Sequence, residues 1–177
     1  MKELSKKILT LPIRLALVIL IIGALFKIMH WPYSRELMFL GSIAIGVIYL
    51  IRFFNKKPKL RLDYVKLALV IIWVFSYFIN VFHLYNIPYV IEVCLIILFI
   101  WWYAEEGFTY FKNRKFKKKG LVRVMYYILL VIGLTTFLFG LLFKIQHWPY
   151  DSLLFVLGTL TLCLILVIDY FVIERIF

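Results

Sequence analysis

One stretch of eight residues occurs twice in this chain, as FKIMHWPY at residues 26–33 and as FKIQHWPY at residues 143–150. Seven of the eight positions are identical at an offset of 117 residues, and glycines before and after the stretch also correspond. Self-similarity at a fixed offset is typical of a chain built from repeated units. Proline blocks continuation of the preceding helix and is tolerated in the first turn of the next one. Each copy therefore predicts a tight turn between two helices.

The segments on both sides of each turn are strongly apolar. Of the 177 residues, 65% are hydrophobic and 19% are aromatic, whereas soluble domains have about 45–50% apolar residues. A soluble fold of roughly 150 residues still exposes about a third of the surface of its unfolded chain, so this composition excludes a soluble enzyme. It also excludes a disordered chain, because the charged residues are confined to a few short segments.

Six apolar runs are long enough to cross a bilayer. A helix of about 20 residues spans a hydrocarbon core of about 30 Å, and these runs lack the period-2 alternation of barrel strands. The predicted spans are residues 11–29, 36–54, 65–84, 88–104, 124–143 and 152–173. No small-residue cleavage site follows the first run, so we predict a retained span and not a signal peptide.

The basic residues predict the orientation of these spans. Of the 21 Lys and Arg residues, only Lys27, Arg35 and Lys144 lie on the side of the proline turns. The others lie before or near the start of the first span, in or next to two long linkers, or after the last span. The cytoplasmic side of a membrane protein carries such an excess. We therefore predict a multi-pass protein of the cell inner (cytoplasmic) membrane with both termini in the cytoplasm. The basic linkers are also placed to lie against anionic headgroups.

The net charge of +12 has nucleic-acid binding as an alternative explanation. Residues that bind phosphate backbones lie on one folded, water-exposed face, whereas the basic residues here alternate with apolar runs, so we expect no nucleic-acid partner. Cys94 and Cys163 lie inside apolar runs without a CxxC motif or a Cys/His cluster. We therefore expect two free thiols and neither a metal nor a cofactor.

A fainter third copy of the repeat lies between the other two, at an offset of 56 residues from the first. The residues that it shares with the first copy are Phe82, Pro88, Tyr89 and Glu92. Its polar signature is lost, with His83, Asn86 and Ile87 at the positions of the lysine, histidine and tryptophan. Each copy holds two spans, so all three enter the membrane in the same sense.

The predicted fold is therefore all-α, an integral membrane protein whose six transmembrane helices form three tandem parallel-repeat helical hairpins. We expect residues 1–177 to form a single transmembrane domain. Its internal repeats are expected at about 11–54, 65–104 and 124–173.

The repeated turn has a structural and a functional interpretation. In the structural one, lysine reaches the headgroups, tryptophan and tyrosine form the aromatic belt, and proline sets the turn. In the functional one, each lysine and the histidine three residues later form a proton or ion site, because they share a helix face and histidine titrates near physiological pH. The residues of this motif or proton/ion site are Lys27, His30, Trp31, Pro32, Lys144, His147, Trp148 and Pro149.

The stretch from Gly23 to Pro32 resembles the N-terminal transmembrane region of GldL, a gliding-motility-associated protein family of Bacteroidota. The resemblance implies a two-helix hairpin of an inner-membrane motor that couples the proton-motive force to gliding and type IX secretion. It also implies the single-span protein GldM as a partner. The residues that match the family motif are Lys27, His30, Trp31 and Pro32, and in the second copy Lys144, His147, Trp148 and Pro149. The family's second helix carries a membrane-buried glutamate, but neither Gly41–Ile51 nor Gly158–Ile168 contains an acidic residue.

These observations predict a structural or interaction role in a membrane complex, of the kind that serves gliding motility or type IX secretion. The alternative is a proton- or ion-conducting membrane component that uses the Lys/His pairs at the outer helix ends. No nucleophile–base pair or metal cluster in the sequence favours an enzyme, so we expect no enzymatic activity and no catalytic residue. The expected partners are the lipid bilayer and other membrane proteins of a motor or secretion complex.

Overall fold

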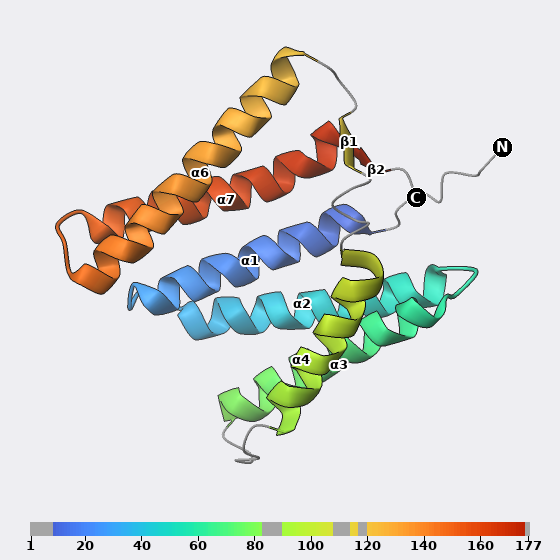
Figure 1. Cartoon of the computed structure of the whole chain (residues 1–177). Helices are drawn as coiled ribbons and strands as arrows, with labels where there is room; N and C mark the ends of the chain where they lie inside the picture. Colours follow the sequence, from blue (N-terminus) through green and yellow to red (C-terminus); the bar gives the residue numbers. More distant parts are fainter. Residues whose placement is uncertain (1–8, 83–89, 108–113, 117–119, 176–177) are drawn as a thin grey trace. The chain divides into compact units, whose positions relative to one another are not determined.

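The computed structural model describes residues 9–82, 90–107, 114–116 and 120–175 (Figure 1). The chain divides into two compact units. The first unit is built mainly from Ser42–Arg114, and the second combines Arg14–Gly41 with Lys115–Arg175. Each unit is described by itself below.

Helices make up most of the described residues. The elements in chain order are α1 (Thr10–Ile28), α2 (Ser34–Asn55), α3 (Arg61–Phe82), α4 (Val90–Trp102), the π-helical turn η1 (Tyr103–Gly107), β1 (Arg114–Phe116), α6 (Leu121–Gln146), α7 (Asp151–Val172) and β2 (Ile173–Arg175). All of the predicted apolar spans that the structure describes are helical. The two three-residue strands pair with each other outside the helices.

Among the residues that the structure describes, five helices are long and apolar enough to cross a membrane, namely α1, α2, α3, α6 and α7. Their boundaries lie within a few residues of the predicted spans. The predicted fourth span differs, because α4 has 13 α-helical residues before the backbone continues into η1. The turn predicted at Pro88 and Tyr89 lies outside the described residues, as do His83, Asn86 and Ile87.

The second unit packs its helices closely at glycine. In the α6–α7 hairpin (orange to red in Figure 1), a Cβ atom on Gly140 would lie 2.4 Å from the backbone nitrogen of Phe155, and one on Gly158 would lie 2.4 Å from that of Phe137. These distances are shorter than any ordinary contact, so only glycine permits this approach of the two backbones. The small core of the hairpin includes Tyr126 and Ile165.

The α1–α2 pair repeats this arrangement in the part of α2 that belongs to the second unit. A Cβ atom on Gly23 would lie 2.7 Å from the backbone nitrogen of Met38, and one on Gly41 would lie 2.8 Å from that of Leu20. All four residues precede their counterparts in α6 and α7 by 117 positions. The repeated sequence therefore encodes the same helix–helix contact twice.

The first unit contains the rest of α2, with α3, α4 and η1, and α3 packs against α4. Phe53 of α2 is buried and its ring lies 5.2 Å from that of Tyr64 in α3. A Cβ atom on Gly46 would lie 3.4 Å from Cγ2 of Val74, an ordinary contact distance. At both of these places the helices meet through side chains.

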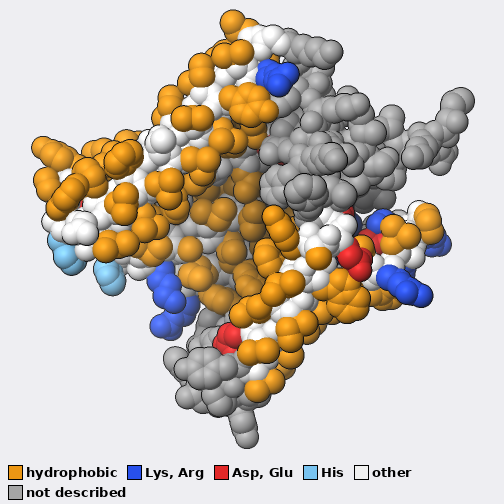
Figure 2. Space-filling view, in the orientation of Figure 1, with side chains coloured by type: hydrophobic (Ala, Val, Ile, Leu, Met, Phe, Trp, Pro, Cys, Tyr) orange, Lys and Arg blue, Asp and Glu red, His pale blue; other side chains and the backbone are white. Residues whose placement is uncertain are grey.

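The helix surfaces are mostly apolar (Figure 2). Large hydrophobic side chains such as Phe75 of α3 and Phe139 of α6 are more than half exposed. Soluble monomers rarely expose large apolar patches, whereas helices that face lipid require apolar surface. Cys94 and Cys163 are both free thiols, as predicted, and the first is exposed while the second is buried.

Candidate functional site

The two repeated turns have the same backbone conformation. Residues His30 and His147 both adopt φ of 54°, and Tyr33 and Tyr150 both adopt φ of 65°. The left-handed region is uncommon for residues other than glycine, although histidine is enriched there. Two matched pairs of rare conformations show that the sequence repeat is also a local structural repeat.

The hydrogen bonds explain the order of residues in the motif. The backbone N–H of Trp31 donates to the carbonyl of Phe26 at 2.8 Å, and that of Trp148 donates to the carbonyl of Phe143 at 2.9 Å. A bond of this span, with a left-handed residue just before its donor, is the Schellman arrangement that ends a helix. Proline follows at once and prevents the helix from continuing.

An aromatic contact closes each turn. The rings of Phe26 and Trp31 lie 5.0 Å apart, and those of Phe143 and Trp148 also lie 5.0 Å apart. A hydrophobic contact between these two positions commonly accompanies the Schellman arrangement. Phenylalanine, histidine, tryptophan and proline each therefore have a structural role in stopping the helix, which leaves the lysine as the motif residue that the turn does not explain.

The two motif lysines have different surroundings. Lys144 lies 3.8 Å from a carboxylate oxygen of Asp151, at the start of α7. Ser34 stands at the corresponding position after Lys27, so the first turn lacks this carboxylate. The Lys144 ammonium also lies 3.8 Å from Met29 Sδ. The two motif turns therefore lie at the same end of the second unit, which we call the turn end.

The motif side chains are mostly exposed at the turn end. Lys27 and both histidines are exposed, as are both tryptophans and both prolines, while Lys144 is half-buried. Figure 2 shows histidine side chains at the surface there. The structure thus places the residues of both turns at one end of the second unit.

A second polar cluster lies at the opposite end of the second unit. Arg14 of α1 forms an ion pair with Asp169 of α7, and its guanidinium also donates to the carbonyl of Leu166 at 2.9 Å. The hydroxyl of Tyr126 in α6 donates to the other oxygen of Asp169 at 3.1 Å. The side chains of Arg14 and Asp169 are only 11% and 10% exposed. We call these three residues the Arg14–Asp169–Tyr126 cluster.

This cluster fixes the direction of the helices in the second unit. It joins the beginning of α1 to the beginning of α6 and the end of α7, whereas Met29 and Lys144 bring the ends of α1 and α6 together. Helices α1 and α6 therefore run in the same direction, and α7 runs in the opposite one.

Sequence reasoning did not identify the Arg14–Asp169–Tyr126 cluster. In the sequence, Arg14 lies near the start of the first predicted span and Asp169 lies near the end of the sixth. The sequence does indicate that each of these residues needs a partner, because ionisable residues within membrane spans are costly and are usually paired. The partner lies 155 residues away in the chain, and the apolar pattern of the helices does not indicate which faces meet.

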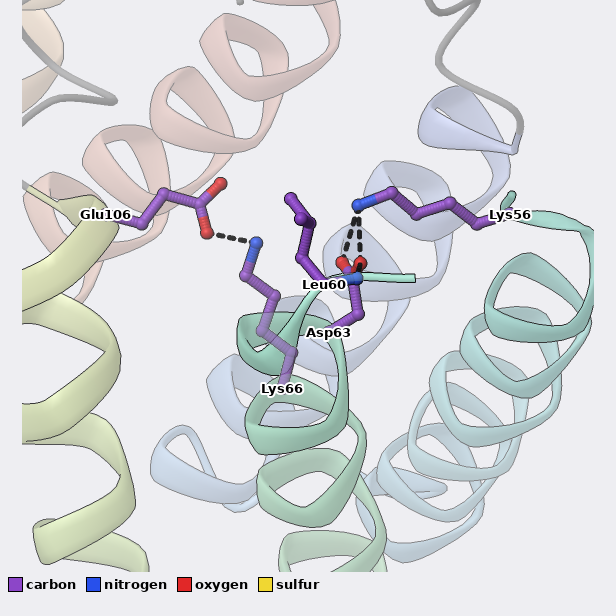
Figure 3. A network of polar contacts seen from close by, with 5 residues as sticks. All are labelled: Lys56, Leu60, Asp63, Lys66 and Glu106. Carbon is purple, nitrogen blue, oxygen red and sulfur yellow. Dashed lines mark hydrogen bonds and ion pairs between the residues drawn. The ribbon is translucent and has the colours of Figure 1, made fainter. Parts of the chain in front are cut away.

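The first unit has a polar network of its own (Figure 3). Lys56 donates to both carboxylate oxygens of Asp63, at 2.6 and 2.7 Å, and the backbone N–H of Leu60 donates to the same carboxylate at 2.9 Å. The N–H of Asp63 donates to the carbonyl of Leu60 at 2.9 Å in return, so Asp63 caps the start of α3. Lys66 of α3 forms an ion pair with Glu106 of η1.

None of these arrangements has the composition of a metal site. Among the described residues, no group of three His, Cys, Asp or Glu side chains is placed to bind a metal ion. The Arg14–Asp169–Tyr126 cluster and the network around Asp63 are ion pairs that hold helices together. The turn end is the one exposed polar surface that the repeated motif builds.

Comparison with known proteins gives a match over the segment that forms the first hairpin. Residues 15–68 match the family model described as the GldL N-terminal domain. This range includes most of α1, the first motif turn, all of α2 and the start of α3. No curated protein and no solved structure matches the chain. The chain is therefore a multi-pass membrane protein whose residues 15–68 are similar to the GldL N-terminal domain.

Proposed function

We propose that this protein is a structural and interaction component of a membrane complex of the gliding-motility or type IX secretion type. In this proposal it lies in the inner membrane as three tandem hairpins, with six spans and both termini in the cytoplasm. It has no enzymatic activity, and it binds other membrane proteins of the complex through its helices and its turn end.

The observation that carries the proposal is the match of residues 15–68 to the GldL N-terminal domain, together with a second copy of the same turn at residues 143–150. The matched backbone angles, hydrogen bonds and ring contacts of the two turns support a common structural role. The extensive apolar helix surface supports burial in lipid and against other spans.

Cross-linking in native membranes tests the proposal. A photo-reactive amino acid is placed at Tyr150, at the turn end, and separately at Leu138, on an exposed face of α6. We expect cross-links to proteins of a gliding or secretion complex, including a single-span protein of the GldM type, and copurification of the same proteins in mild detergent. A chain that cross-links to none of them and purifies alone would contradict the proposal.

Proton or ion conduction through the Lys/His pairs is the second hypothesis, and a specific observation limits it. Between the turn end and the Arg14–Asp169–Tyr126 cluster, the helix segments 15–26, 128–143 and 152–168 contain no Asp, Glu, Lys, Arg or His. The segment in α6 alone corresponds to about 24 Å of helix at 1.5 Å per residue. The threonines within these segments donate to carbonyls of their own helices, for example Thr159 to Phe155.

A flux measurement separates the two hypotheses. In liposomes with the purified chain and an imposed pH gradient, the structural proposal predicts no proton flux above that of empty liposomes. Conduction predicts a flux that falls in the variants Lys27→Ala and Lys144→Ala. Such a flux would replace the structural proposal by the conduction hypothesis.

A further inference from the structure

The linker between α2 and α3 has more basic residues than the neighbouring carboxylates neutralise. Residues 56–61 contain four Lys or Arg side chains and no acidic one. Lys56 is engaged by Asp63. Lys57, Lys59 and Arg61 are all exposed, and the structure gives none of the three an ion pair with a described carboxylate.

These free cations lie beside exposed apolar side chains. Phe54, Leu60 and Tyr64 are 66%, 62% and 56% exposed, although they lie in or next to the ends of two span-length helices. The ammonium of Lys59 lies 4.5 Å from the centroid of the Phe53 ring and 5.6 Å from that of Phe54. This cation–π interaction holds the ammonium of Lys59 next to the exposed aromatic side chains.

The linker is held in this arrangement by contacts that leave the three cations available. The capping interaction of Asp63 with Leu60 and the ion pair with Lys56 fix the beginning of α3 (Figure 3). The ring contact between Phe53 and Tyr64 fixes the end of α2 against it. The surface is therefore preorganised and not a flexible basic tail.

We propose that Lys57, Lys59 and Arg61 form a docking surface for the headgroup of an anionic phospholipid, with Phe54, Leu60 and Tyr64 in contact with the upper part of its acyl chains. We call these six residues the linker patch. The phosphate accepts charge-assisted hydrogen bonds from the ammonium and guanidinium groups. The apolar neighbours distinguish a lipid from a water-soluble anion, because only a lipid presents phosphate and hydrocarbon together.

Charge complementarity and position favour a lipid over a nucleic acid or an acidic protein. The patch lies where two span-length helices meet the linker. If these helices cross the bilayer, their ends are at the depth of the headgroups. Basic residues next to a span are attracted to anionic lipid in this way. The inference requires membrane insertion but not the proposed role in a complex. The lipid site and the proposed function are therefore tested independently.

Lipid titration of the purified, delipidated chain followed by native mass spectrometry tests the inference. The probes are phosphatidylglycerol and phosphatidylcholine with identical acyl chains. We expect the wild-type chain to prefer phosphatidylglycerol and the variant Arg61→Gln to lose about fivefold in affinity for it, as one headgroup charge contact is lost. The triple variant Lys57→Gln/Lys59→Gln/Arg61→Gln should lose the preference for phosphatidylglycerol. The single variant Arg61→Lys, which keeps the positive charge, should retain most of it.

Arg35→Gln is the matched control, because Arg35 is also an exposed arginine in the first turn of a span-length helix. We expect it to change phosphatidylglycerol affinity less than twofold. The inference is overturned if Arg61→Gln and the triple variant bind phosphatidylglycerol like the wild type, or if Arg35→Gln loses as much as Arg61→Gln. It is also overturned if glycerol phosphate without acyl chains competes as well as the lipid. Unchanged elution volume and helix content show that each variant is folded.

Discussion

At the scale of single residues, the histidines of the repeated motif hold the left-handed position that ends α1 and α6. Glycine adopts this conformation without steric cost, whereas for other residues the left-handed conformation costs roughly 1–2 kcal/mol. The variant His147→Gly should therefore retain or raise the free energy of unfolding. His147→Val should lower it by about 1–2 kcal/mol, because a β-branched residue is poorly tolerated there.

Unfolding in mixed micelles of dodecylmaltoside and SDS measures this difference, with Gln146→Val as the control one residue earlier, within the helix. That control should cost only a few tenths of a kcal/mol. If glycine and valine at position 147 had the same effect, the backbone role of the histidine would be wrong.

The Arg14–Asp169–Tyr126 cluster gives a second residue-scale prediction. Removing one partner of a buried ion pair leaves an uncompensated charge, which costs about 3–5 kcal/mol. We expect Asp169→Leu to destabilise the chain by this amount, and the double variant Arg14→Leu/Asp169→Leu to recover most of the loss. Tyr126→Phe, which removes only the hydroxyl, should cost about 0.5–1.5 kcal/mol.

A double-mutant cycle in the same micelle assay checks this prediction. If the losses of Arg14→Leu and Asp169→Leu simply add in the double variant, the two charges do not interact in the membrane. The cluster would then have no part in holding α1 against α7.

At the scale of elements, the close approach of α6 and α7 depends on glycine. An alanine at Gly140 or Gly158 would place its Cβ 2.4 Å from backbone nitrogen, and backbone cannot move aside as a flexible side chain can. We expect Gly140→Ala to force the helices apart and to cost about 1–3 kcal/mol, the range typical of overpacked contacts.

Gly46→Ala is the matched control for this contact, because the Cβ atom of the alanine would lie 3.4 Å from a side-chain atom of Val74. It should change stability by less than about 0.5 kcal/mol. Thermal unfolding of both variants in detergent provides the comparison. Equal midpoints for Gly140→Ala and Gly46→Ala would show that the glycine contact does not hold the hairpin together.

The positions of the helices were predictable from the sequence because specific residues mark the helix ends. Proline and the motif end α1 and α6, and clusters of charge surround the other ends, so the predicted boundaries agree with the structure within a few residues. The Schellman turn was not predicted, because the left-handed position that usually indicates it by a glycine is occupied by a histidine. The pairing of Arg14 with Asp169 was not predictable either, because helices that are apolar all round do not show which face packs inward.

At the scale of the whole molecule, the distribution of basic residues predicts that the α2–α3 linker faces the cytoplasm and that the motif turns face the opposite side. The parallel directions of α1 and α6 agree with one consistent orientation of the second unit. Cysteine labelling tests the prediction for the chain in its membrane. Single cysteines are introduced as Lys57→Cys, Lys117→Cys, Ser34→Cys and Ser152→Cys in a background with Cys94 and Cys163 replaced by alanine.

A membrane-impermeant maleimide added to spheroplasts should label positions 34 and 152, and should reach positions 57 and 117 only after the membrane is opened. The cost of moving several Lys and Arg side chains through hydrocarbon, about 2.5–3.5 kcal/mol each at the bilayer centre, makes mixed orientations rare. Labelling of Ser34→Cys but not of Ser152→Cys would mean that the two hairpins with the motif enter from opposite sides. In that case the contact between Met29 and Lys144 could not form within one chain, and the shared turn end would have to be abandoned.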